Sequence, residues 1–171
     1  MRIEPASPND LADVRAAYAH GRSTQREQGS IVWPEFSDAA ILNEIDAGLL
    51  FRVVADDAIV GVFSVAYDDA AIWGAHERGA HIYLHRIARA ADFPGRGLVD
   101  AILAWADGRC TALGRIGLRM DTWANNTALI EFYGRRGFRL LDHARIGVDP
   151  RLASHYHGNE FALLERSCEH P

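Results

Sequence analysis

The stretch from Phe93 to Ala106, FPGRGLVDAILAWA, constrains the fold most, because two glycines and a proline stand where a long helix begins. The run before it, AHIYLHRIARA, is nearly continuous in apolar residues, as in a strand buried on both faces. A helix N-terminus exposes about four backbone N–H groups, and glycine lets an anion approach them closely. The pattern predicts either a phosphate site at this turn or a plain strand–helix turn in which glycine is a convenience.

Two well-known phosphate-binding patterns do not match this turn. The P-loop requires a Gly-Lys-Ser/Thr sequence, which does not follow here. The dinucleotide fingerprint requires a third glycine where Asp100 stands, and an early βαβ unit.

Strand and helix signals follow one another along the rest of the chain. We expect helices from Ser7 to Gly21 and from Ser37 to Gly48, a hairpin around Asp56 and Asp57, and a loop or strand end at DDAAIWGAHERG. The full expected order is β-α-α-β-β-β-α-β-α-β-β. Such an order needs a buried sheet of six or seven strands with about four helices on its faces, an α/β (α+β) fold.

Length and composition fit one soluble domain over residues 1–171. The net charge of -5 argues against a nucleic-acid partner, and no apolar run of about 18 residues suggests a membrane span. The start, MRIEPASPND, lacks the apolar region of a signal peptide. Cys110 and Cys168 do not make a disulfide framework, so we expect a reduced, cytoplasmic protein.

Two motifs in the centre of the chain resemble those of the GNAT superfamily of N-acetyltransferases. The family's strand, Gln/Arg-x-x-Gly-x-Gly/Ala and helix correspond to HRIARAADFPGRGLVDAILAWA. A second family motif corresponds to LRMDTWANNTALIEFYGRRGF, with Asn126 at a helix start, Tyr133 seven residues later, and a closing Gly137-Phe138. Together the motifs cover about Tyr83 to Phe138.

The resemblance implies a three-layer acyl-CoA N-acyltransferase fold with a mixed, twisted sheet. It also implies acetyl-CoA as co-substrate, bound in a V-shaped opening between the two central strands. The pantetheine arm would pair with the backbone of residues 87–89, the pyrophosphate would rest on the amides of residues 93–98, and Asn126 would touch the cofactor arm or hold the local turn. The implied cofactor-binding residues are Ile87, Ala88, Arg89, Phe93, Pro94, Gly95, Arg96, Gly97, Leu98, Asn126 and Tyr133.

Three positions depart from the family pattern. Asp92 stands at the usual Gln or Arg, Pro94 where a basic residue is common, and Val99 where a small residue is usual. Arg89 and Arg96 are candidates to supply the missing positive charge.

Tyr133 is implied by the resemblance to be the acid that protonates the leaving CoA thiolate. The alternative is a core aromatic, because Leu129, Phe132 and Tyr133 share one helical face. Amine acetylation also needs a base. The side-chain candidates are His85 and Glu77, ahead of His81, Asp121 and His143. A chain of water molecules is favoured over any one of these side chains.

The acceptor side is expected at IVWPEF. Trp33, Phe36 and Trp73 are candidates to wall a pocket in which Glu35 attracts a cationic amine; the alternative for this segment is helix packing. We expect no metal site at His155 and His157, because structural zinc sites usually need four ligands.

The sequence therefore predicts an N-acetyltransferase that moves an acetyl group to a primary amine of a small molecule or peptide. The alternatives are a longer acyl-CoA, or a non-catalytic acyl-CoA sensor or interaction module. A symmetric homodimer is a further expectation, through the closing strands and the SHYHGN loop.

Overall fold

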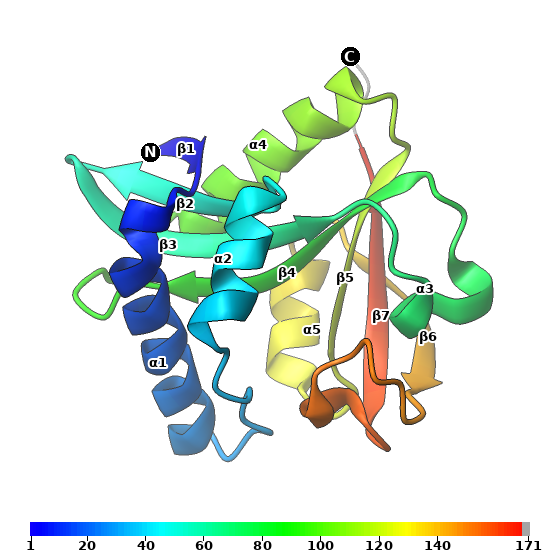
Figure 1. Ribbon diagram of the computed structural model, residues 1–171. Coiled ribbons are helices and arrows are strands. Elements are labelled where there is room, and N and C mark those ends of the chain that lie inside the picture. Colours follow the sequence, from blue (N-terminus) through cyan, green and yellow to red (C-terminus); the bar gives the residue numbers. More distant parts are fainter. Residues whose placement is uncertain (169–171) are drawn as a thin grey trace. The chain divides into compact units, whose positions relative to one another are not determined.

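The computed structural model describes residues 1–168. Its seven strands follow the order β1-β2-β3-β4-β5-β7-β6 in one mixed sheet (Figure 1), which confirms the predicted α/β fold. The strands are β1 (Arg2–Pro5), β2 (Leu50–Ala55), β3 (Ala58–Ala66), β4 (His81–Arg89), β5 (Gly117–Trp123), β6 (Arg139–Arg145) and β7 (Glu160–Ser167). The helices are α1 (Leu11–Glu27), α2 (Asp38–Asp46), α3 (Ala70–Trp73), α4 (Leu98–Ala112) and α5 (Thr127–Gly134).

The expected order of elements is confirmed, with one addition and one difference. The addition is α3, a single turn of helix within the segment expected as loop. The difference is that α1 continues past Gly21 to Glu27. A Cβ at Gly21 would lie 3.1 Å from the Trp33 ring, so this glycine makes room for the indole and does not end the helix.

Side chains cap the helices as the sequence predicts. The Ser37 hydroxyl accepts a hydrogen bond from the Ala40 N–H at 3.2 Å, and the Asp10 carboxylate accepts one from the Ser7 N–H at 2.7 Å. The Asp56-Asp57 turn has φ values of 48° and 60°, as a tight two-residue hairpin requires.

The chain divides into two compact units, Met1–Val65 with Leu84–Ala106, and Ala66–Tyr83 with Asp107–Pro171. In the first unit α1 and α2 cover one face of β2 and β3, and the early part of α4 covers the other (Figure 1). Successive side chains of a strand point to opposite faces of the sheet. Leu50 and Val62 pack toward α1 and α2, whereas Phe51 and Phe63 contact Trp105 of α4 at 4.5 and 5.3 Å between ring centroids.

The second unit is built on β5, β7 and β6, which pair antiparallel, while the first residues of β4 run parallel to β5. One face carries an apolar cluster made of Ile72, Trp73, Tyr83, Trp123, Ile146, Phe161 and Leu163. β6 lies at the end of the strand order, next to β7, and most of its side chains are exposed.

The expectation that the cysteines are reduced is wrong, because Cys110 and Cys168 form a disulfide with their Cα atoms 6.5 Å apart. The turn at residues 115–116 brings them together. The Arg115 N–H donates to the Cys110 carbonyl at 2.9 Å, and the Cys168 N–H donates to the Ile116 carbonyl at 3.1 Å. The 58-residue separation hides this proximity in the sequence.

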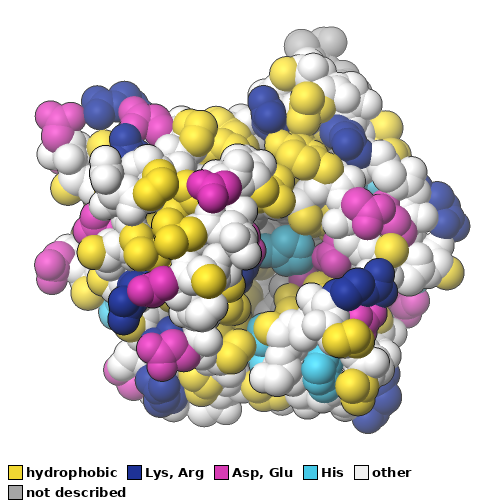
Figure 2. Space-filling model, in the orientation of Figure 1, with side chains coloured by type: hydrophobic (Ala, Val, Ile, Leu, Met, Phe, Trp, Pro, Cys, Tyr) yellow, Lys and Arg dark blue, Asp and Glu magenta, His cyan; other side chains and the backbone are white. Residues whose placement is uncertain are grey.

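Among the described residues, no helix is both long enough and apolar enough to cross a bilayer. On the face shown in Figure 2, basic and acidic side chains are interspersed, in keeping with the net charge of -5.

Reduction of the disulfide should lower the free energy of unfolding by about 2–4 kcal/mol, because a long loop in the unfolded chain is released. Urea unfolding with and without reductant measures this, and a Cys110→Ser, Cys168→Ser double variant should match the reduced protein. Two titratable thiols in the native, unreduced protein would contradict the pairing.

Candidate functional site

The turn between β4 and α4 has the backbone that the two glycines were expected to provide. Gly95 and Gly97 have φ values of +79° and +74°, a region that residues with a Cβ rarely adopt. A Cβ at Gly95 would also lie 3.3 Å from Cδ of Arg89. Glycine is therefore required here by the backbone conformation and, at Gly95, by the room that Arg89 takes, directly before α4 begins at Leu98.

Arg89 shapes this turn through its side chain. One guanidinium nitrogen donates to the carbonyl oxygens of Ala90, Ala91 and Phe93 at 3.2, 3.0 and 2.6 Å. The carbonyl groups are thereby gathered around a cation, while the Phe93 and Leu98 N–H groups donate to the carbonyls of Ala90 and Gly95 at 3.2 and 3.3 Å. Asp92 and Arg96 are exposed. The turn fits a phosphate group, by its glycines and by the positive end of a 15-residue helix.

The strand that leads into the turn contains an unusual residue, Arg86, with a φ of +49°. A left-handed conformation costs a non-glycine residue on the order of 1–3 kcal/mol and persists only where the surroundings hold it. Arg86 lies in β4 between the half-buried His85 and the three residues Ile87, Ala88 and Arg89. No sequence pattern signals this conformation.

The segment IVWPEF packs on α1, and part of it lines a pocket. Trp33 and Phe36 pack on Tyr18, with ring centroids 6.2 and 5.2 Å away. Phe36 and Glu35 also line a pocket of about 230 Å³, together with side chains of α1 and α2. The pocket-lining residues are Arg15, Ala16, Tyr18, Ala19, Arg22, Glu35, Phe36 and Ile41.

In the second unit, Asn126 and Tyr133 stand at the two ends of α5. The Asn126 side-chain oxygen accepts a hydrogen bond from the Leu129 N–H at 3.1 Å, so it caps the helix. Tyr133 is buried between Phe132 and Phe138, with ring centroids 5.2 and 5.7 Å away. Burial raises the pKa of Tyr133 to about 12. The phenol keeps its proton at neutral pH, as an unperturbed tyrosine also does, so the shift agrees equally with a core aromatic.

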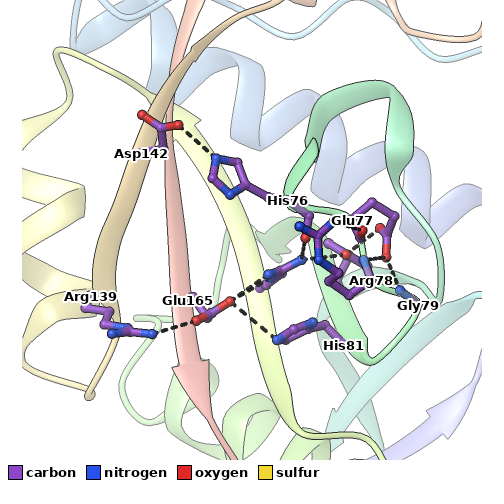
Figure 3. A network of polar contacts seen from close by, with 10 residues as sticks. His76, Glu77, Arg78, Gly79, His81, Arg139, Asp142 and Glu165 are labelled. Atoms are coloured by element: carbon purple, nitrogen blue, oxygen red, sulfur yellow. Dashed lines mark hydrogen bonds and ion pairs between the residues drawn. The ribbon is translucent and has the colours of Figure 1, made fainter. Parts of the chain in front are cut away.

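Glu77 occupies a nest of donors (Figure 3). Its carboxylate accepts hydrogen bonds from the N–H groups of Asp69, Arg78 and Gly79 at 2.9, 2.7 and 2.5 Å, and from the Tyr83 hydroxyl at 2.5 Å. Desolvation by burial opposes the charged form, but the Tyr83 and backbone hydrogen bonds together outweigh it and lower the pKa of Glu77 to about 2. So weak a base is poorly suited to take a proton from an amine, and we assign Glu77 a structural role.

Arg119 connects this loop to β7. It is buried and donates to the Glu165 carboxylate at 2.9 and 2.7 Å, to the His76 carbonyl at 2.8 Å and to the Tyr83 hydroxyl at 3.1 Å. His81 lies 3.4 Å from the same Glu165 carboxylate (Figure 3), and burial is the main cause that lowers the pKa of His81. No pattern in the sequence signals this network.

The structure does not place Trp73 at a pocket wall. Its side chain is 1% exposed and lies in the apolar cluster of the second unit, with the Arg119 guanidinium 4.5 Å above its ring. The His-rich loop binds its own backbone, because Nε2 of His157 donates to the Asp149 carbonyl at 2.9 Å. That nitrogen is thus engaged with the backbone of the same loop.

A mixed sheet whose strand β4 leads through a glycine turn into α4 defines an α/β domain. The model of the acetyltransferase (GNAT) family matches residues 17–138. The chain therefore belongs to the GNAT family of acetyltransferases.

Known proteins agree with this assignment. The chain is 27% identical over 161 residues to the uncharacterized N-acetyltransferase YesJ of Bacillus subtilis (strain 168), covering 90% of this chain and 85% of YesJ. A GNAT acetyltransferase from Listeria monocytogenes has the same fold, with a TM-score of 0.73 and 20% identity over 97% of this chain and 94% of its own. YncA from Salmonella typhimurium, solved with acetyl-CoA, has a TM-score of 0.68 and 14% identity over 100% and 95% of the two chains.

A Glu77→Gln variant tests the structural role of Glu77. Its pKa is lower in the folded protein, so its stabilisation is present above about pH 4.5 and is lost as the pH falls toward 2. We expect the variant to lose roughly 1–3 kcal/mol of unfolding free energy at pH 7 and less at pH 3, measured by urea unfolding. An exposed control, Asp142→Asn, should change stability little. A Glu77→Gln protein that is as stable as wild type but has greatly reduced turnover would instead indicate that Glu77 is the catalytic base.

Proposed function

We propose that this chain is a single-domain N-acetyltransferase over residues 1–171, which transfers an acetyl group from acetyl-CoA to a primary amine by direct attack. The observation that carries the proposal is the turn from Ile87 to Leu98. Two left-handed glycines, a helix N-terminus and carbonyls gathered by Arg89 together suit a pyrophosphate. Direct attack needs no covalent intermediate, and both cysteines are held in the disulfide.

In the proposed complex the backbone of residues 87–89 pairs with the pantetheine arm, and the amides of residues 93–98 hold the pyrophosphate. When bound, acetyl-CoA supplies an acetyl group activated as a thioester. Backbone N–H groups near Ile87 to Arg89 polarise its carbonyl, a contribution typically worth about 3–4 kcal/mol for one well-placed donor. Asn126 adds rigidity by capping α5.

Tyr133 is the proposed acid that returns a proton to the departing thiolate. The motif of Asn126, Tyr133, Gly137 and Phe138 supports this role, and Phe132 and Phe138 hold the ring of Tyr133 in place. The amine loses its proton to a chain of water molecules or to His85, which lies on β4 directly before Arg86. Glu77 is left out of the mechanism because its pKa of about 2 makes it a poor base.

The acceptor is proposed to be a small-molecule or peptide amine that approaches Trp33, Glu35 and Phe36. A homodimer through β6, β7 and the SHYHGN loop remains a prediction, and light scattering tests it. Cytoplasmic location likewise remains a prediction.

A panel of amines tests the function, with free thiol as the readout for acetyl-CoA, propionyl-CoA and longer acyl-CoA. The chain contains no lysine, so acetylation of its own side chains cannot produce a background. We expect one class of primary amine to release CoA and to gain an acetyl group by mass spectrometry. Tight binding of acetyl-CoA with no turnover on any amine would favour the alternative function, a non-catalytic acyl-CoA sensor.

Replacement of Tyr133 by phenylalanine keeps the packing but removes the proton. We expect kcat to fall about 100-fold, the low end of the usual effect of a general acid, with KM for acetyl-CoA nearly unchanged. Tyr67→Phe, which alters a tyrosine at the Arg109 side chain, is the matched control and should behave as wild type. Wild-type turnover in Tyr133→Phe would leave Tyr133 as a packing residue.

A further inference from the structure

Arg86 of β4 is the one non-glycine residue outside the Asp56-Asp57 hairpin that has a positive φ in the described part of the chain. A left-handed residue within a strand reverses the usual alternation of side chains, as in a β-bulge. In β4 it comes immediately before residues 87–89, whose backbone we propose to pair with the cofactor. Whatever holds Arg86 in this conformation therefore also sets the direction of that backbone.

The guanidinium of Arg86 is held by polar groups of α2 and β3. It forms an ion pair with Glu44 and donates to the Ser64 hydroxyl at 3.2 Å, and Ser64 in turn donates to the other Glu44 oxygen at 3.1 Å. The side chains of Arg86 and Glu44 are only 22% and 27% exposed, so water screens the pair weakly. Charge-assisted hydrogen bonds of this kind are among the stronger polar contacts in proteins.

The same guanidinium lies over two aromatic rings. Its central carbon is 4.9 Å from the centroid of Phe36 and 5.9 Å from that of Tyr18. Tyr18 also contacts Phe36, at 5.2 Å between ring centroids, and its hydroxyl lies 3.5 Å from that of Ser64. One side chain thus joins α1, the segment of residues 31–37, α2 and β3 to the central strand.

We propose that Arg86 is a positioning residue that couples the acceptor-side segment, residues 31–37, to the cofactor-pairing backbone of β4. The ion pair with Glu44 and the contact with Phe36 hold the segment in place, and the same contacts hold the left-handed turn. The inference rests on the proposed function for the assignment of residues 31–37 to the acceptor and of residues 87–89 to the cofactor. The coupling itself lies within the first unit and is measurable without turnover.

Two substitutions of Arg86 separate the side chain from the backbone. Glycine removes the side chain and adopts a φ near +49° without strain, whereas alanine removes the same contacts and disfavours that φ. In Arg86→Gly and Arg86→Ala alike, amide hydrogen exchange of residues 31–37 in the CoA-free protein should rise roughly 10- to 100-fold, the loss expected for a charge-assisted contact. The dissociation constant for CoA should rise about five-fold more in Arg86→Ala than in Arg86→Gly.

A matched control is Arg52→Ala, which breaks another shielded ion pair of the same unit, with Asp10 and Glu4, away from residues 31–37. It should lower stability without changing exchange at residues 31–37. If both Arg86 variants fail to fold, Glu44→Gln gives the same test, since it weakens the ion pair and leaves Arg86 in place. Its exchange at residues 31–37 should rise, and KM for the acceptor should rise more than KM for acetyl-CoA.

Unchanged exchange at residues 31–37 in every Arg86 and Glu44 variant would overturn the proposal. Equal CoA affinity of Arg86→Gly and Arg86→Ala would also overturn it, because the left-handed conformation at position 86 would then have no effect on the cofactor-pairing backbone. Neither outcome depends on finding an acceptor. The coupling can therefore fail while the amine panel succeeds, or hold while the panel fails.

Discussion

The arrangement of the first unit depends on how backbone groups are presented where β4 ends and α4 begins. Backbone that binds a ligand cannot also be fully paired within the protein, and glycine is needed where the ligand approaches closely. Arg89 draws three carbonyl groups of the turn to itself. Gly61 of β3 also helps to set the position of α4. A Cβ at Gly61 would lie 2.8 Å from the Leu98 side chain and would push this first residue of α4 away.

Much of this could be predicted from the sequence, where the signals are local. The glycine turn, the Ser37 and Asn126 caps and the Asp56-Asp57 hairpin each arise from residues within a few positions of one another, and each appears as expected. The order of elements, and with it the family, follows from such local signals.

Contacts between distant positions could not be predicted in this way. Cys110 meets Cys168 across 58 residues, and Glu77 acquires its donors only once the loop before β4 folds back on itself. Glu77 was a reasonable base by residue type, but its surroundings make it a poor one. Trp73 was a reasonable pocket wall by position, but Arg119 covers it in the core. The conformation of Arg86 is likewise set by Glu44 and Phe36 rather than by its neighbours in sequence.

The central claim is that the backbone from Ile87 to Leu98 holds the cofactor, and amide hydrogen exchange with and without saturating CoA tests it most directly. We expect slower exchange at residues 87–89 and 93–101 when CoA is bound, with little change in β1 or at the hairpin of residues 55–58. Saturable CoA binding that leaves residues 87–101 unprotected, or that protects another part of the chain instead, would contradict it.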